Sequence, residues 1–171
     1  RNASTTTFSF TVSLNTPAGP GAVSFDIATQ DNTATTANND YVPISLTGQV
    51  IAEGLTMYTI NVTVNGDLTI EDNETFFVNL TNVVNAGVAD AQGTGTISND
   101  DSATLTLTGG ITQNEGNAGS VAYTFTTTLS SAVQGGFQVA YTTDNGTATT
   151  ADNDYADNDA ALVFTGTAGE V

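Results

Sequence analysis

Hydrophobic residues alternate with threonine and serine along much of the chain. The stretch TFSFTVSL (residues 7–14) places Phe8, Phe10, Val12 and Leu14 on one side of an extended chain, and YTINVTV (residues 58–64) repeats the pattern. Alternation over this length is typical of half-buried strands in an antiparallel sheet. No segment shows the longer period of an amphipathic helix. The pattern therefore predicts an all-β protein.

Short strands are predicted along the whole chain. Clusters of glycine, asparagine and aspartate separate them, as turns require. Strands this short, spaced about ten residues apart, predict a β-sandwich with Greek-key connections. The predicted strands cover residues 6–14, 22–29, 44–51, 57–65, 74–83 and 93–98, and then 102–109, 121–129, 137–143 and 161–166.

One loop sequence occurs twice with few changes, as DNTATTANNDY at residues 31–41 and as NGTATTADNDY at residues 145–155. The flanking strands recur at the same offset of 114–115 residues, which makes the chain a tandem repeat. We place the first domain at residues 1–101 and the second at residues 102–171. On this alignment we expect the first copy to lack its first strand and the second copy to lack its last strands.

The unfinished copies allow two interpretations. In one, the chain is a piece cut from a longer array of repeats. In the other, it is a natural subunit whose exposed strand edges are completed by strands of neighbouring copies, giving a head-to-tail filament. The size of the protein in solution distinguishes them, because only the second interpretation requires polymers.

The charge balance limits the classes of partner that the chain can bind. The chain has 18 acidic residues, one arginine, no lysine and no histidine, for a net charge of −17. Nucleic acid is excluded as a partner, because binding phosphates requires a basic surface. Membrane insertion is not expected, because no apolar stretch approaches about 18 residues. Small hard cations, Ca²⁺ above all, are the natural partners of so many carboxylates.

The missing residue types also exclude most catalytic chemistry. Without histidine or cysteine the chain has no Ser-His-Asp or Cys-His arrangement and no zinc site of the usual kind. A carboxylate pair of the glycosidase type is still available, but the chain has no tryptophan to form a sugar platform. We therefore predict no enzyme activity and name no catalytic residue.

Four motifs carry a resemblance to a known family. They are VNGDLTIEDNETFFVNLTN (residues 64–82), GTGTISNDD (93–101), NEGNAG (114–119) and NGTATTADNDY (145–155). With these motifs the chain resembles two Calx-beta modules, which occur in sodium–calcium exchangers and in large extracellular repeat proteins, including those of the bacterial adhesin type. The resemblance implies tandem immunoglobulin-like Greek-key sandwiches of about seven strands each, with calcium held by acidic loops at one end.

The resemblance also implies a set of calcium ligands. Gly66 and Asn99 stand where some members have acids, so a complete set is not expected. The acids also have a structural interpretation, in which Asp40 caps its turn while Tyr41 packs on the sandwich end and its hydroxyl bonds the backbone. The implied ligands are Asp40, Asp67, Glu71, Glu74, Asp100 and Asp101 in the first copy, and Glu115 and Asp154 in the second.

The expected function is structural. We expect a stalk, surface-layer or fibre segment of an extracellular or cell-surface tandem-repeat protein, stiffened by Ca²⁺ at its domain ends. Its expected partners are neighbouring copies of the same repeat, and a cell-surface or glycan ligand is a further candidate that the sequence does not identify. The alternative is a calcium-responsive regulatory or binding module attached to other domains.

Overall fold

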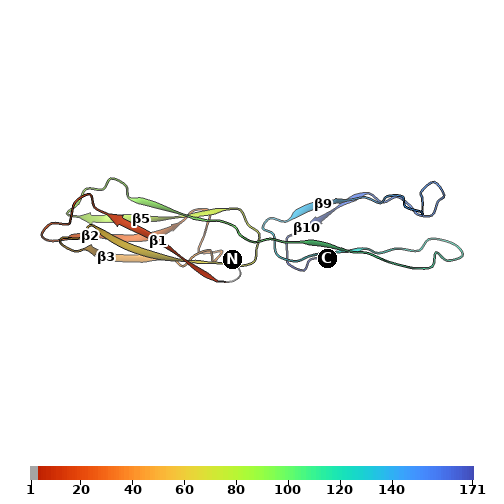
Figure 1. Ribbon diagram of the computed structural model, residues 1–171, viewed down its shortest axis with the longest axis horizontal. Coiled ribbons are helices and arrows are strands. Elements are labelled where there is room, and N and C mark those ends of the chain that lie inside the picture. Colours follow the sequence, from red (N-terminus) through yellow and green to blue (C-terminus); the bar gives the residue numbers. More distant parts are fainter. Residues whose placement is uncertain (1–3) are drawn as a thin grey trace. The chain divides into compact units, whose positions relative to one another are not determined.

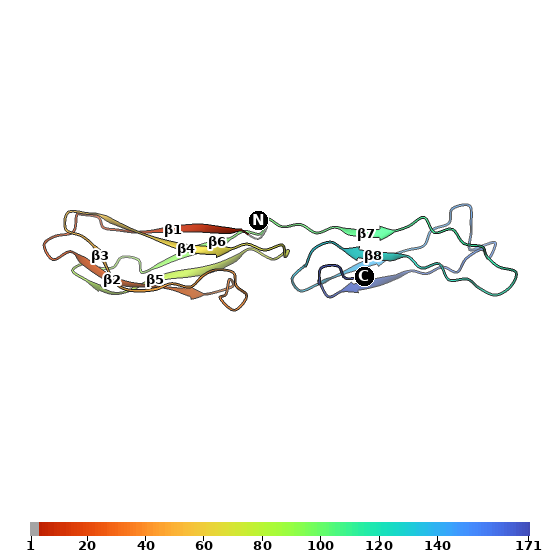
Figure 2. The ribbon, with the colours of Figure 1, turned by 90° about the horizontal axis from the view of Figure 1, so that it is seen from below.

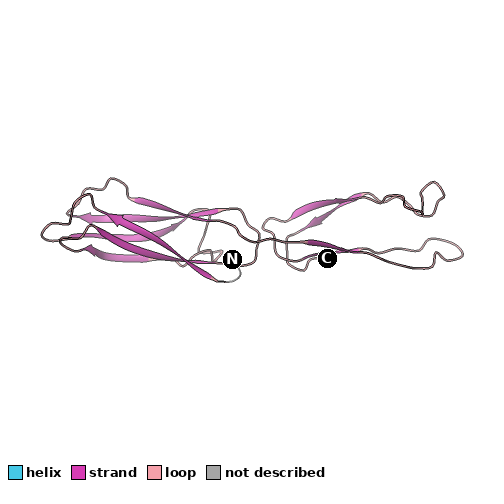
Figure 3. Ribbon diagram, viewed as in Figure 1, coloured by secondary structure: helices cyan, strands magenta, loops and turns pink. Residues whose placement is uncertain are grey.

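The computed structural model describes residues 4–171, and all regular structure in this part of the chain is β (Figures 1 and 3). The prediction of an all-β fold is therefore confirmed. Within the described residues, no helix is long and apolar enough to cross a membrane. The strands are β1 Thr5–Ser13, β2 Val23–Asp31, β3 Ser45–Ile51, β4 Met57–Asn65, β5 Glu74–Val84, β6 Gln92–Ile97, β7 Leu105–Thr108, β8 Thr126–Leu129, β9 Phe137–Tyr141 and β10 Ala160–Phe164.

The chain divides into two compact units. Within the described residues, the first unit runs to Leu68 and continues over Asp72–Asp100. The second unit comprises Asp101–Val171, and the short segment Thr69–Glu71 of the β4–β5 loop is grouped with it. Each unit has its own sheets, as expected for a tandem repeat.

Two antiparallel sheets form the first unit, and Figure 2 shows β1 and β4 on one side of it. β1 pairs with β4 over its full length, while the second sheet has the strand order β3-β2-β5-β6. The alternating pattern directs one row of side chains from each strand between the sheets. Phe25, Ile27, Val62 and Phe76 form the centre of this core, each no more than 2 % exposed.

Phe76 organises the first core. Its ring stacks on Tyr41 at a centroid distance of 4.6 Å and meets Phe10 edge-on at 5.9 Å. On the neighbouring strand, Gly95 lies directly opposite Phe76. A Cβ atom at Gly95 would lie only 2.5 Å from the ring, so only glycine fits there without a shift. This contact explains one glycine of the motif at residues 93–101.

The second unit contains two short sheets, one pairing β7 with β8 and the other β9 with β10. The rings of Phe137 and Phe164 stack at a centroid distance of 5.0 Å, and Leu129 is 2 % exposed. The prediction of a strand over residues 121–129 was wrong in length, because β8 covers only Thr126–Leu129. Among the described residues no strand pairs with residues 121–125, and a strand needs a hydrogen-bonded neighbour.

Candidate metal centre

The repeated loop holds Asp40 in place. Asn39 adopts a positive φ of 68°, a conformation that asparagine tolerates better than most residues. The Oδ2 atom of Asp40 then accepts a hydrogen bond from the backbone N–H of Thr35 at 2.6 Å. The backbone carbonyl of Asp40 accepts another from the N–H of Asn65 at 2.9 Å. The side chain of Asp40 is 9 % exposed, so the loop fixes a largely buried carboxylate.

Tyr41 anchors the same loop to the core. Its side chain is 2 % exposed, and its hydroxyl donates to Oδ1 of Asp31 at 2.5 Å. That hydrogen bond lowers the pKa of the Asp31 carboxyl, while burial, followed by the interaction with Asp31, raises the pKa of Tyr41 to about 12. The structural interpretation of the loop is confirmed in its turn and packing. The interpretation was wrong about the partner of the Tyr41 hydroxyl, which is the side chain of Asp31 and not the backbone. Asp31 stands at the start of the same loop, and its carboxylate lies within hydrogen-bond distance of that hydroxyl.

The second copy of the loop repeats two of these hydrogen bonds. Oδ2 of Asp154 accepts from the N–H of Thr149 at 2.9 Å, and Asn153 has a φ of 63°. The Tyr155 hydroxyl donates to Oδ1 of Asn145 at 2.7 Å. Asn145 therefore accepts the tyrosine hydrogen bond that Asp31 accepts in the first copy. This acceptor position was not predicted, although an oxygen-bearing side chain stands at the same place in both copies of the loop.

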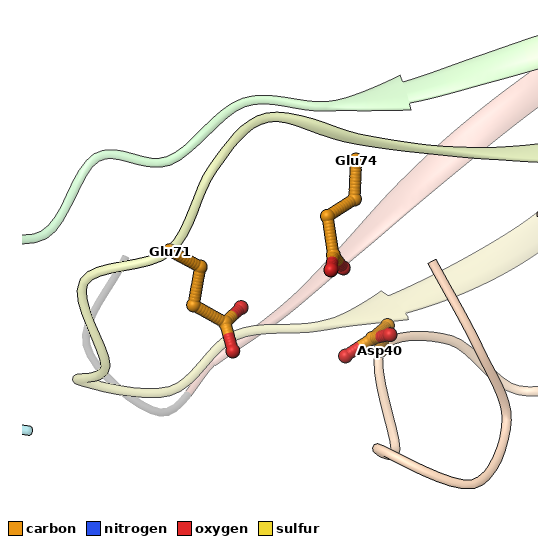
Figure 4. Close-up of side chains that lie close together, drawn as sticks. All are labelled: Asp40, Glu71 and Glu74. Carbon is orange, nitrogen blue, oxygen red and sulfur yellow. The ribbon is translucent and has the colours of Figure 1, made fainter. Parts of the chain in front are cut away.

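Three carboxylates converge beside the first loop, as Figure 4 shows for Asp40, Glu71 and Glu74. One oxygen of each lies within 4.8 Å of the others. Glu74 opens β5 and is 9 % exposed, and Glu71 lies in the β4–β5 loop and is half-buried. Oxygens bound to one Ca²⁺ lie at most about 5 Å apart, twice the usual Ca–O distance. The spacing and the hard oxygen donors therefore fit a calcium ion.

The other predicted ligands are not part of this group of three in residues 4–171. Asp67 is exposed in the β4–β5 loop, and Asp100 is exposed at the end of the first unit. Asp101 is half-buried at the start of the Asp101–Val171 segment, while Glu115 and Asp154 are exposed within it. A ligand role for these five residues stays a prediction.

Comparison with known family models matches one family to most of the chain. The family model described as Calx-beta domain matches residues 2–108 and again residues 98–170. Among solved structures, the calcium binding domain CBD12 of CALX1.1 is 22 % identical with a TM-score of 0.48, covering 95 % of this chain and 65 % of that one. CBD12 from CALX1.2 is 23 % identical with a TM-score of 0.48, covering 95 % of this chain and 66 % of that one. No curated protein matches the chain.

Proposed function

The chain belongs to the Calx-beta family, and from this membership we propose that it is a calcium-stiffened spacer of an extracellular tandem-repeat protein. The observation that carries the proposal is the group formed by Asp40, Glu71 and Glu74, whose carboxylate oxygens lie within 4.8 Å of one another. The loop that holds Asp40 recurs in the second copy with the same hydrogen bond from a threonine N–H to the aspartate carboxylate. The proposed ligand is Ca²⁺.

Electrostatics supports a bound cation. Asp40 and Glu74 are each 9 % exposed, so water screens their charges incompletely. With 18 acidic residues, one arginine and no lysine, the chain has a net charge of −17. A divalent cation would offset the mutual repulsion of the three carboxylates. Because it would bind the folded state alone, it would also stabilise that state.

The repeated organisation supports the proposed spacer role. Modules in tandem form extended arrays in which each contacts mainly its neighbours, and such arrays need no catalytic chemistry. Asp100 and Asp101 stand at the boundary between the two units, where we propose that they add ligands. The proposed neighbours are further copies of the same repeat. For the proposed extracellular setting we expect a weak calcium affinity of about 10⁻⁴–10⁻³ M, as is usual for extracellular modules.

Spin labels would test directly whether calcium restricts the motion of the two units relative to each other. The chain has no cysteine, so Thr59→Cys in β4 and Thr106→Cys in β7 place one unique label in each unit. We expect calcium to narrow the distribution of distances between the labels relative to EDTA. The narrowing should be lost with Asp100→Asn/Asp101→Asn and kept with the control Glu53→Gln, an exposed acid in the turn before β4. Equal distributions in calcium and EDTA would refute the stiffening.

A further inference from the structure

The chain contains two asparagine–glycine pairs, and the structure holds them differently. They are Asn65-Gly66 at the end of β4 and Asn145-Gly146 in the second copy of the repeated loop. In such a pair the backbone nitrogen of the glycine can attack the side-chain amide carbon of the asparagine, because glycine has no Cβ to hinder the approach. The reaction replaces the amide with a carboxylate, so each pair is a place where the chain could gain a negative charge.

The fold restrains the pair Asn65-Gly66. The backbone N–H of Gly66 donates to the carbonyl of Ser4 at 3.0 Å. Nδ2 of Asn65 donates to the carbonyl of Asn39 at 2.8 Å. Both residues of the pair are half-buried, and Asn65 lies opposite Thr5 in the β1–β4 sheet. Attack requires both hydrogen bonds to break, so the fold opposes reaction at this pair.

The pair Asn145-Gly146 lies in a loop between β9 and β10, and both residues are exposed. The backbone N–H of Gly146 donates within the loop, to the carbonyl of Ala148 at 3.2 Å, which is at the long end of the hydrogen-bond range. The equivalent residues of the first copy, Asp31 and Asn32, are exposed as well, so exposure belongs to this place in the loop. Freeing the glycine nitrogen therefore requires less local opening here than at the end of β4.

Two donors point at the side-chain oxygen of Asn145. Oδ1 accepts from the Tyr155 hydroxyl at 2.7 Å and from the N–H of Thr150 at 3.0 Å. Attack on the amide carbon places negative charge on this oxygen, and donors already aimed at a developing oxyanion lower the barrier. The loop therefore holds the amide in a polarised state.

The first copy shows that the loop also accommodates the product. There Asp31 stands at the place of Asn145, at an offset of 114 residues. Its carboxylate accepts from the Tyr41 hydroxyl and from the N–H of Thr36, the same two donor positions. A carboxylate at residue 145 would thus meet two donors that are already in place.

We propose that Asn145-Gly146 is a site of spontaneous deamidation, which gives the second copy of the loop the carboxylate that Asp31 supplies in the first. The nitrogen of Gly146 attacks Cγ of Asn145 and passes its proton to water, ammonia leaves, and a succinimide ring remains. Water then opens the ring at either carbonyl and gives aspartate or isoaspartate. The sum consumes water and releases ammonia without oxidation or reduction, and it adds one negative charge to the net −17. This inference goes beyond the calcium-stiffened spacer and does not depend on calcium.

Peptide mapping by mass spectrometry tests the site, with Asn65 as the control in the same chain. The full chain is incubated at mildly alkaline pH, which favours loss of the proton from the glycine nitrogen, and the conversion of each asparagine is followed over time. We expect Asn145 to convert at least about tenfold faster than Asn65, because fewer hydrogen bonds must break. Equal conversion of the two, or faster conversion of Asn65, would overturn the assignment.

Two variants separate the glycine from the donors. A Cβ at Gly146 meets no atom within 4 Å, so Gly146→Ala should fold normally and slow conversion of Asn145 at least about tenfold by hindering the approach. Tyr155→Phe removes one donor to Oδ1 and should slow conversion about threefold to tenfold, less than in a water-excluded site. The control Tyr123→Phe, which removes an exposed hydroxyl bonded to the carbonyl of Gln113, should leave the rate unchanged.

Thermal midpoints equal to that of the wild type would show that the variants remain folded. An unchanged rate in Gly146→Ala would overturn attack by the glycine nitrogen. An unchanged or faster rate in Tyr155→Phe would overturn the role of its hydroxyl as an oxyanion donor.

Discussion

Replacing Glu74 by glutamine should have opposite effects on stability with and without calcium. An oxygen of Glu74 and one of Asp40 lie within 4.8 Å of each other, and each side chain is 9 % exposed. At an effective dielectric constant of about 20, two unit charges at this distance repel by about 3.5 kcal/mol. Solvent screening reduces this value, so we expect Glu74→Gln to raise the free energy of unfolding in EDTA by about 1–2 kcal/mol.

In calcium the same substitution removes a ligand. A site filled at about 100 times its Kd stabilises the folded state by about 2.7 kcal/mol, and the variant should lose most of this gain. The assay is urea unfolding followed by tyrosine fluorescence, because the chain has five tyrosines and no tryptophan. It is run in EDTA and in about 10 mM CaCl₂, which exceeds the Kd values usual for extracellular modules.

Glu53→Gln is the matched control. Glu53 is exposed in the turn between β3 and β4, and the same chemical change there should shift stability equally in both buffers. Our reasoning would be refuted if Glu74→Gln were destabilising in EDTA and kept the full response to calcium. That result would mean that the Glu74 carboxylate serves the fold and not a cation.

The remaining predictions concern the core and the loop. Gly95→Ala should lower the free energy of unfolding by about 1–3 kcal/mol, because its Cβ would lie 2.5 Å from the ring of Phe76. Gly87→Ala has no atom within 4 Å of the new Cβ and should change stability little, so equal urea midpoints for the two variants would contradict this explanation. Because folding raises the pKa of Tyr41 from 10.0 to about 12, its contribution to stability is complete below pH 10 and is lost as the pH rises toward 12. Tyr41→Phe should flatten that alkaline decline in thermal midpoint, and an unchanged decline would exclude Tyr41 as its cause. Because folding lowers the pKa of Asp31 from 3.8, its contribution is present above pH 3.8 and is lost as the pH falls further, an acid loss that Asp31→Asn should reduce.

Much of the fold could be predicted from the sequence, because burial of one sheet face imposes a period of two residues. The first strand was expected at residues 6–14 and lies at Thr5–Ser13, and β4 was predicted to the residue. The prediction failed at residues 121–125, where the alternation is present but no strand lies alongside in the described structure. Periodicity reports which side chains are apolar, and it does not report whether a partner strand is present.

The candidate site was less predictable for a physical reason. Asp40 and Glu74 are separated by 33 intervening residues in the sequence, and only the pairing of strands brings their oxygens within 4.8 Å. Both were named through a family resemblance, which also named five acids that the structure does not gather into the same group. The hydrogen bond from Tyr41 to Asp31 was missed because side-chain partners across a loop depend on its exact turns, which the repeated letters alone do not specify.

Calorimetric titration of the full chain with CaCl₂ would show whether Asp40, Glu71 and Glu74 bind calcium. We expect saturable binding with a Kd of about 10⁻⁴–10⁻³ M. We also expect Asp40→Asn to weaken this binding at least about tenfold, because a charged ligand is lost from a largely buried site. No saturable binding at millimolar calcium, or an unchanged Kd in Asp40→Asn, would contradict the assignment of Asp40, Glu71 and Glu74 as a calcium site.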